Sequence, residues 1–327
     1  MRRSLIGFSR FELPVSCALL LLASLPWLLT LGSLAWGQER TVLVTAEGAG
    51  ALTVLQTGRS ETIPLGGRPH NLAVSPDARR AWVTDASASR VWVVEVSSRK
   101  STALPIQGKG PHGLALSPDG RRAVIAHEGD SLLEVFDAER LTPLGRLALP
   151  ARPHNVAVSP DGRMGWITTQ SAGRLLAVDL TAVQLVGEIE VQGAPHDLAF
   201  TPDAGELWVT LWGSSRVLVV DVRGKKVSQQ VTAGSLPHHV AVTPDGSQVW
   251  VSNHGSGDVS VFETAGRRLL RRIGVGPDPH HVAFSRDGTL AYVVGQGRDE
   301  LVVVEVGSGR VQSRIRVGRA PHGVAVR

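Results

Sequence analysis

The sequence predicts an all-β protein, a seven-bladed β-propeller with four-stranded antiparallel blades, and three observations support this prediction. One motif recurs every 42 residues, each period contains four strand-like segments, and the two ends of the chain carry complementary parts of one blade. The composition agrees, because 36 Gly and 19 Pro separate short runs rich in Val, Leu and Trp. A length of 327 residues alone would suggest two domains, but an internal repeat takes precedence over that estimate.

A Pro-His pair marks every period, without a single insertion between one pair and the next. Seven positions after the His an Asp follows in six periods, and five residues further on comes an aromatic residue or Val. The Pro-His pair, the Asp and the aromatic residue or Val all recur with the same 42-residue period, and this does not arise by chance. The seven histidines are His70, His112, His154, His196, His238, His280 and His322.

Each period reads as four strands in order. Asn71–Val74 is a short apolar first strand, and a turn begins at Ser75-Pro76-Asp77, because Pro presets its φ and Asp bonds nearby amides. Ala81–Thr84 forms the second strand, Val91–Val96 the third, and a more polar fourth strand ends near the next Pro-His pair. The short first strand suits the crowded centre of a propeller, and the polar fourth strand suits its outer edge.

A left-handed residue is expected to close the turn between the first and second strands. Glycine occupies this position in four periods, whereas Ala78 and Ala204 replace it in two others, and Arg286 replaces the proline of the turn in a further period. We therefore expect these three turns to be less regular.

The chain ends predict how the ring closes. Pro321–Arg327 is one innermost strand, and Thr41–Leu65 supplies three strands without an innermost partner. Joined, they make the seventh blade, and a closed ring leaves no open sheet edge. Residues 38–327 are therefore expected to form a single domain.

The first 37 residues read as an export signal. A basic start (Arg2, Arg3, Arg10) precedes the apolar segment Leu13–Leu31, and Ala35-Trp36-Gly37 offers a small-x-small cleavage site before Gln38. The alternative is an uncleaved membrane anchor formed by residues 13–31. Either interpretation predicts a periplasmic or secreted propeller, held at the membrane in the second case.

Two features of the composition limit the chemistry. The only cysteine, Cys17, lies in the apolar segment, so the expected mature chain has no disulfide, no thiolate nucleophile and no Cys-based metal site. The net charge is +5, but the arginines are scattered, and the sequence lacks a long basic run that would follow a phosphate backbone. Nucleic acid is therefore an unlikely partner.

The repeat Pro-His-x-x-Ala-x-Ser-Pro-Asp-Gly, followed by aromatic-Val-x-Asn, resembles the YVTN β-propeller repeat of bacterial and archaeal extracytoplasmic proteins. Trp250-Val251-Ser252-Asn253 is the nearest copy of its second half. The resemblance covers residues 41–327 and implies a seven-bladed propeller, but it implies little about activity, because such folds host many functions. More distantly, the chain is similar to the haem d1 domain of cytochrome cd1 nitrite reductase, to lactonase propellers and to the streptogramin lyase.

The predicted ligand site is one mouth of the central channel. The seven histidines lie in the loops that enter the innermost strands, and the loops between second and third strands open on the same face. These loops carry the residues that differ between periods. The candidate ligand contacts are His70, His112, His154, His196, His238, His280, His322, Trp212, Asp85 and Asn253. A structural role competes for the histidines, since a neutral imidazole can donate one N–H to a carbonyl of the next blade.

A metal or haem-like cofactor is the alternative occupant of this mouth. Zinc or copper requires three or four nitrogens at about 2.0–2.1 Å, and a seven-fold ring around an open channel is expected to be too wide for one ion. His238, His254 and His280, from adjacent blades, are the more plausible ligands. His239 and His281 are expected to point the opposite way, because successive strand residues alternate faces.

Acid–base chemistry would require a titratable pair at the mouth, and His127 beside Glu128 is the best candidate, although Glu128 also reads as a solvated loop carboxylate. The sequence therefore leaves two functions open. The first is a monomeric extracytoplasmic propeller that binds a partner protein or small ligand without catalysis. The second is a metal- or haem-dependent enzyme or cofactor carrier (nitrite reductase d1-like, lactonase or lyase) that uses the same mouth.

Overall fold

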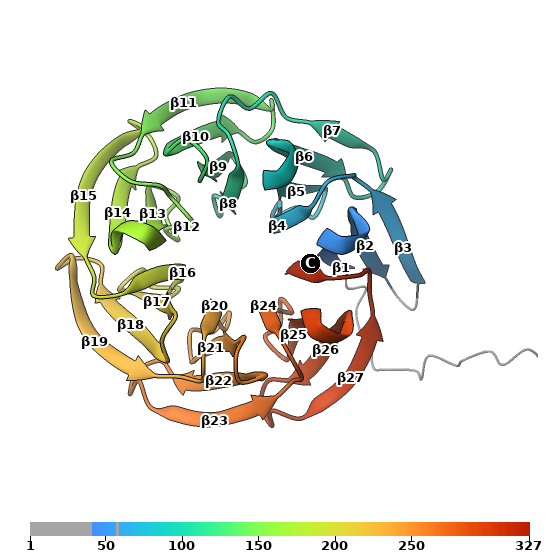
Figure 1. The fold of residues 1–327 in the computed structure, drawn as a ribbon, viewed down its shortest axis with the longest axis vertical. Coiled ribbons are helices and arrows are strands. Elements are labelled where there is room, and N and C mark those ends of the chain that lie inside the picture. The colour runs from blue at the N-terminus through green and yellow to red at the C-terminus, as the bar shows by residue number, and fades with distance from the viewer. Residues whose placement is uncertain (1–40, 57–58) are drawn as a thin grey trace, which may run out of the picture. The chain divides into compact units, whose positions relative to one another are not determined.

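The computed structural model describes residues 41–327 except 57–58, which form seven β-sheets arranged as a ring around a central channel (Figure 1). Every sheet has four strands that pair antiparallel, as predicted for the blades. The expected signal segment, residues 1–37, lies outside the described residues. Within 41–327 no helix is both long and apolar enough to cross a bilayer.

The strands of each blade follow the chain from the channel outward, except in the blade that closes the ring. The innermost strands are β28 (Pro321–Val326), β4 (Pro69–Val74), β8 (Pro111–Leu116), β12 (Val156–Val158), β16 (Ala194–Phe200), β20 (Pro237–Val242) and β24 (Pro279–Phe284). The second strands are β1 (Thr41–Ala46), β5 (Arg80–Asp85), β9 (Arg122–His127), β13 (Met164–Thr169), β17 (Glu206–Trp212), β21 (Gln248–Asn253) and β25 (Leu290–Gly295).

The outer half of each blade is built in the same way. The third strands are β2 (Ala51–Gln56), β6 (Arg90–Glu95), β10 (Leu132–Asp137), β14 (Arg174–Asp179), β18 (Arg216–Asp221), β22 (Asp258–Glu263) and β26 (Glu300–Glu305). The outermost strands are β3 (Arg59–Pro64), β7 (Ser101–Ala103), β11 (Thr142–Ala148), β15 (Gln184–Glu190), β19 (Lys226–Thr232), β23 (Leu269–Gly274) and β27 (Val311–Arg316). Single 3-10 turns follow four of the second strands, namely η1 (Glu47–Ala49), η2 (Ala86–Ala88), η3 (Gln170–Ala172) and η4 (Gln296–Arg298).

The ring closes between the two ends of the described chain, as predicted. Strand β28 pairs with β1, with Val324 opposite Val44 and Val326 opposite Val42. The pairing continues to the last residue, because the amide of Arg327 donates to the carbonyl of Thr41 at 2.9 Å. The seventh blade is therefore one C-terminal strand added to three strands from the start of the domain.

The hydrophobic core lies between blades rather than within one of them. Each of the seven apolar clusters of the described residues joins side chains from two neighbouring sheets. The aromatic register supplies their largest members, since Trp82, Trp166, Trp208, Trp250 and Tyr292 are at most 2% exposed. One cluster contains both Val42 and Tyr292, so apolar packing also spans the closing blade.

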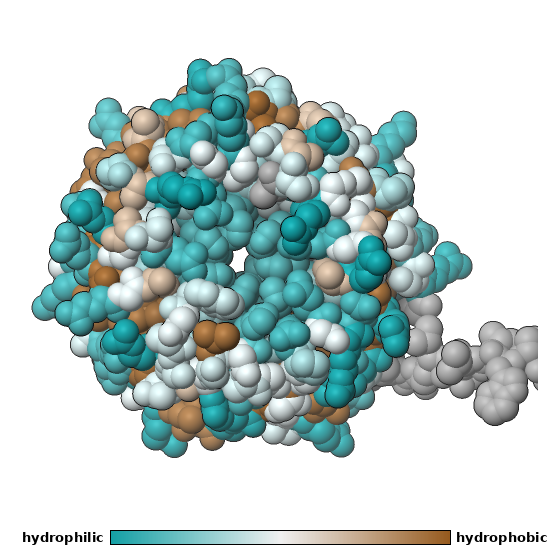
Figure 2. Space-filling model, in the orientation of Figure 1, coloured by the Kyte–Doolittle hydropathy of each residue, from teal (hydrophilic) through white to brown (hydrophobic). Residues whose placement is uncertain are grey.

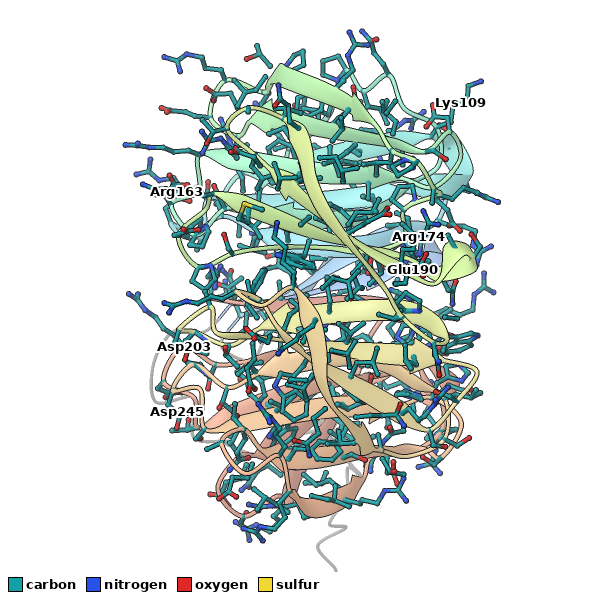
Figure 3. All side chains as sticks on the ribbon, turned by 90° about the vertical axis from the view of Figure 1, so that its left-hand side faces the viewer. Lys109, Arg163, Arg174, Glu190, Asp203 and Asp245 are labelled. Carbon is teal, nitrogen blue, oxygen red and sulfur yellow. The ribbon has the colours of Figure 1, made fainter. Side chains whose placement is uncertain are left out.

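The Ser-Pro-Asp turns lie on the face opposite the Pro-His loops. Figure 3 shows Asp203 and Asp245, which belong to the equivalent Thr-Pro-Asp turns, on one face of the ring, and Lys109, which precedes a Pro-His loop, on the other. The expected irregularity of three turns was wrong. Ala78 and Ala204 adopt the left-handed φ of 61° and 57° that glycine adopts elsewhere, and the turn containing Arg286 keeps the same 2.8 Å closing hydrogen bond as its neighbours.

Candidate functional site

The seven repeated histidines form a closed ring, here called the histidine ring, whose imidazoles contact one another around the channel. Neighbouring ring centroids are 3.6 to 4.6 Å apart, and the shortest separation joins His322 to His70 across the closing blade. Six of the seven residues are at most 9% exposed. The histidine ring is thus narrower than the open collar expected from the sequence. Seven histidines were expected to be too far apart to bind one ion, but neighbouring members of the ring are close enough to do so.

A β-bulge explains how the histidines reach the channel. In six blades the pairing between the first and second strands slips by one residue just after the proline, so that two residues of the innermost strand oppose one of its neighbour. A bulge re-aims side chains and breaks the alternation of faces. The prediction that His239 and His281 point away from their neighbours was therefore wrong. His281 lines the same cavity as His238 and His280. The ring of His239 stacks on that of His281, with the two centroids 4.1 Å apart.

The residue after each ring histidine belongs to a second ring, which is Asn71, Gly113, Asn155, Asp197, His239, His281 and Gly323. Its polar members bond to one another. The amide of Asn71 donates to the Asn155 oxygen at 2.9 Å, and the Asn155 amide donates to Asp197 at 3.0 Å. Asp197 in turn lies 3.6 Å from His239. The second ring is thus a hydrogen-bonded network whose composition differs from blade to blade.

The strongest departure from seven-fold symmetry occurs at the rim of the mouth. The rim position directly follows the second-strand residue that pairs with the repeated proline. In six blades the residue at this position of the repeat is polar or aromatic, namely Glu47, Glu128, Gln170, Trp212, His254 and Gln296. These side chains give each sector of the mouth a different chemistry.

Trp212 and Glu47 are two of the rim residues that contact the histidine ring. Trp212 stacks on His196 with ring centroids 5.2 Å apart and an interplanar angle of 26°. Across the mouth, Glu47 accepts a 2.8 Å hydrogen bond from Arg68 and lies 3.7 Å from His70. Together with Gln296 and the ring histidines, they line a cavity of about 330 Å³. Figure 2 shows a hollow at the centre of one face, bordered by hydrophilic residues.

The histidine ring is electrically neutral at physiological pH. Burial, reinforced by the neighbouring histidines, lowers the pKa of His196 and of His280 to about 3. Burial also lowers the pKa of His112, although the nearby Glu128 carboxylate partly opposes the shift. Neutral imidazoles keep one nitrogen lone pair each, so the floor of the cavity can accept hydrogen bonds or bind a metal.

The hydrogen bonds of the imidazoles divide the histidine ring into two halves. His112, His154 and His196 each place Nδ1 3.0 to 3.1 Å from the carbonyl of the next ring histidine, as expected from the sequence for a donor to the neighbouring blade. This contact assigns the proton to Nδ1 and leaves Nε2 as the acceptor. On the other side of the ring, Nδ1 of His70, His238, His280 and His322 has no hydrogen-bond partner among the described residues.

Two groups could hold a metal ion in the described part of the chain. Ligand atoms of His238, His280 and His322 lie within 4.8 Å of one another, as do those of Glu47, His70 and His322. The trio predicted from the sequence differs by one member: the ring of His254 is 5.2 Å from that of His280, and its Nε2 lies 3.8 Å from Asp278. The structure thus brings His238 and His280 together with His322 as the third nitrogen donor.

The proposed pair of His127 and Glu128 is not assembled. His127 is fully buried, and its Nε2 lies 2.9 Å from the equally buried Glu134. Glu134 also accepts the amides of Gln107 and Gly108 at 3.1 and 3.3 Å, so the His127–Glu134 pair anchors the loop that enters the blade. Burial raises the pKa of Glu134, but the His127 contact and the two amides outweigh it and leave that pKa below its ordinary value.

Asp85 and Asn253 were expected to contact a ligand, but the structure places both inside their blades. Each is 0% exposed and bonds to the loop that precedes its own innermost strand: Asp85 accepts the amide of Arg68 at 3.1 Å, and Asn253 accepts that of Gly234 at 3.0 Å. Neither lines the cavity, whereas Trp212 and the seven histidines do.

Glu47, Arg68, Asn155 and Gln296 line the cavity but are not among the ligand contacts expected from the sequence. Glu47 occupies the rim position of the closing blade, but it precedes Ala86 in the next blade by 39 residues instead of 42. A search at a fixed period of 42 therefore passes over it. The strand Thr41–Ala46, aligned on its own with Arg80–Asp85, would have found Glu47.

The fold and the channel define a class, the seven-bladed β-propellers with a polar central channel. Within that class the chain belongs to the YNCE-like β-propeller family, whose model matches residues 117–327. No curated protein matches the sequence.

Several solved structures share the fold. They include a functionally unknown protein from Desulfotomaculum acetoxidans DSM 771 (TM-score 0.75, 19% identity, 88% of this chain and 98% of that chain). Hydrazine synthase of Kuenenia stuttgartiensis is similar as well (TM-score 0.71, 19% identity, 78% and 88% coverage). A third is dihydro-heme d1 dehydrogenase NirN in complex with DHE (TM-score 0.66, 18% identity, 87% and 74% coverage). At these identities the likeness concerns the fold alone.

Proposed function

We propose that this protein is an extracytoplasmic binding propeller, without catalysis of its own, that holds a small ligand or a side chain of a partner protein above the histidine ring. The observation that carries the proposal is the cavity at the mouth, where an otherwise repetitive structure becomes asymmetric. A volume of about 330 Å³ is at the lower end of small-ligand sites. Repeated residues serve the fold, whereas a tryptophan occupies the rim position in one described blade only, at Trp212.

The lining indicates what such a ligand offers. His112, His154 and His196 present Nε2 acceptors, so a ligand above them should donate hydrogen bonds. Trp212 offers an aromatic face for a planar group. A small hydrogen-bond donor with a planar part therefore fits best.

A haem-like group receives less support from the geometry. The ring histidines are in contact, with neighbouring centroids no more than 4.6 Å apart, so a macrocycle cannot enter between them. It would have to lie above the histidine ring, between Trp212 and the Glu47–Arg68 pair, in the cavity of about 330 Å³. The site favours a smaller ligand.

Native mass spectrometry of protein purified from its own compartment tests the proposal. We expect a bound non-protein mass in the wild type, its loss in Trp212→Leu, and its retention in Leu144→Ser, a control on the exposed outer strand β11. A wild-type protein that shows only its own mass, and no thermal shift with the small-molecule fraction of that compartment, would contradict a ligand-binding role.

The extracytoplasmic location is a separate part of the proposal and rests on the basic and apolar composition of residues 1–37. Cell fractionation with N-terminal sequencing tests it. We expect a soluble periplasmic or secreted chain that begins at Gln38. A full-length chain in the membrane fraction would support the uncleaved anchor instead, and a full-length chain in the cytoplasm would refute export.

A further inference from the structure

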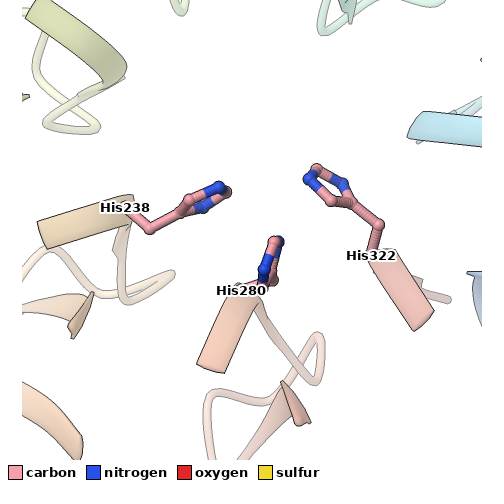
Figure 4. Close-up of side chains that lie close together, drawn as sticks. All are labelled: His238, His280 and His322. Carbon is pink, nitrogen blue, oxygen red and sulfur yellow. The ribbon is translucent and has the colours of Figure 1, made fainter. Parts of the chain in front are cut away.

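Three imidazoles of the histidine ring converge on one point in the channel. His238, His280 and His322 project from the neighbouring strands β20, β24 and β28, and their rings point toward one another (Figure 4). One ligand atom from each lies within 4.8 Å of the other two. All three residues are buried, with exposed fractions of 4 to 7%.

These three histidines lack the hydrogen bond that the opposite half of the ring makes. Nδ1 of His112, His154 and His196 contacts a carbonyl, whereas Nδ1 of His238, His280 and His322 has no partner among the described residues. A buried polar atom without a partner costs roughly 1–3 kcal/mol, so three of them together are unusual in a native protein. The three imidazoles that carry these atoms are the ones that converge in the channel, where one shared ion could bind all three rings.

The protonation state of the trio suits a metal ion rather than an anion. Burial, reinforced by the neighbouring histidines, lowers the pKa of all three imidazoles, and that of His280 falls to about 3. Neutral imidazoles repel no cation, and each offers a lone pair, which is the form that binds metals. An anion would find no positive charge on these rings.

The donor set indicates the class of metal. Three nitrogens, without sulfur or carboxylate, suit zinc, copper or nickel, at metal–nitrogen distances of about 2.0–2.1 Å. Three protein ligands leave a fourth position open, as in sites that bind an exogenous ligand. Glu47, which forms its own close group with His70 and His322, supplies negative charge beside the trio.

We propose that His238, His280 and His322 bind one divalent transition-metal ion of the zinc, copper and nickel class, with its open position facing the cavity at the mouth. The proposal rests on the proposed function, because it assigns one constituent of that binding site. It adds that the ligand above the histidine ring is held in part by a metal.

Zinc titration of metal-stripped protein that carries no histidine tag tests the proposal. We expect one zinc per chain by calorimetry and by elemental analysis after buffer exchange. His322→Asn should weaken zinc binding more than about 100-fold, since even outer-shell changes cost 10–100-fold. Leu144→Ser, on the exposed outer strand β11, is the control, and its zinc affinity should stay within about twofold of the wild type.

A second measurement covers the case in which His322→Asn does not fold. Copper(II) bound to the wild-type protein should show electron–nuclear couplings from three imidazole nitrogens. Absence of stoichiometric metal, equal losses in Leu144→Ser and His322→Asn, or copper without these imidazole couplings would each overturn the assignment.

The outcomes also separate this inference from the proposed function. Stoichiometric zinc binding without any further ligand in the wild type would retain the metal site and remove the small-ligand role. A Trp212-dependent ligand on a protein that binds no metal would do the reverse.

Discussion

Nδ1 of His154 lies 3.1 Å from the backbone carbonyl of His196, so the imidazole of one blade reaches the main chain of the next. The same carbonyl accepts a hydrogen bond from Oγ1 of Thr168 at 2.9 Å. Two side chains of one blade therefore meet at a single buried acceptor of its neighbour. The same imidazole–carbonyl contact recurs at His112 and His196, so in three of the seven blades the histidine joins neighbouring blades as well as lining the channel.

Thr168→Val tests the strength of this junction. The change keeps the shape of the side chain but removes a donor to the His196 carbonyl and an acceptor for the amide of Asn155. We expect the free energy of unfolding to fall by about 1–3 kcal/mol, because buried polar groups lose partners. Denaturant unfolding measures it. Thr142→Val, at an exposed site on β11, should stay within about 0.5 kcal/mol of the wild type, and equal effects would contradict the junction.

Glu134→Ala should be among the most damaging substitutions in the protein. Glu134 is 1% exposed, lies 2.9 Å from the buried His127 and accepts two loop amides. Removing one partner of a buried pair costs about 3–5 kcal/mol, which denaturant unfolding would detect.

The matched control for that substitution is Glu128→Ala, at the partly exposed rim. We expect its free energy of unfolding to stay within about 0.5 kcal/mol of the wild type. If Glu128→Ala were as destabilising as Glu134→Ala, the anchoring role of the His127–Glu134 pair would be wrong.

The sequence predicted the blades, the ring closure and the position of the histidines, because each follows from a strict period. It could not predict contacts that depend on departures from regular geometry. The bulge after the proline brings His239 and His281 toward the channel, where ideal alternation sends them away. Similarly, the position of Asp85 in the repeat predicts a residue at the mouth, but the loop that contains Gly67 covers its side chain. The contact is so close that a β-carbon added at Gly67 would lie 1.8 Å from the Asp85 carboxylate.

Deleting residues 320–327 should destabilise the whole ring. The closing blade would lose strand β28 together with the buried side chains of Val324 and Val326. Strand β1 would then be an unpaired edge of its sheet. With about 2–4 °C for each kcal/mol, we expect the melting temperature to fall by roughly 10 °C or more. Thermal unfolding followed by circular dichroism measures it.

Addition of a synthetic peptide of residues 320–327 provides the control for that deletion. The peptide should restore part of the loss, whereas a scrambled peptide should not. A truncated protein that melts at the wild-type temperature would show that closure by β28 contributes little to stability.

Acid should destabilise the fold well above the range in which its surface carboxylates titrate. His196 and His280 have a pKa of about 3 when folded, against about 6.5 when unfolded. The unfolded chain therefore binds more protons below pH 6.5, so their contribution to stability is complete above pH 6.5 and is lost as the pH falls toward 3. At pH 5 each of the two histidines lowers the free energy of unfolding by about 2 kcal/mol relative to its value above pH 6.5.

Denaturant unfolding between pH 5 and pH 7.5 measures this dependence. The aspartates of the turns, such as Asp77 and Asp119, have a pKa below their ordinary value of 3.8, so they stay ionised in both states across this window and do not contribute to the slope. The slope of the free energy of unfolding against pH reports how many protons the chain takes up when it unfolds. His280→Asn should reduce this number by about one below pH 6.5, because one buried neutral imidazole that is protonated on unfolding has been removed. A wild-type stability independent of pH in this window would mean that the ring imidazoles are protonated, or exposed to water, in the folded protein.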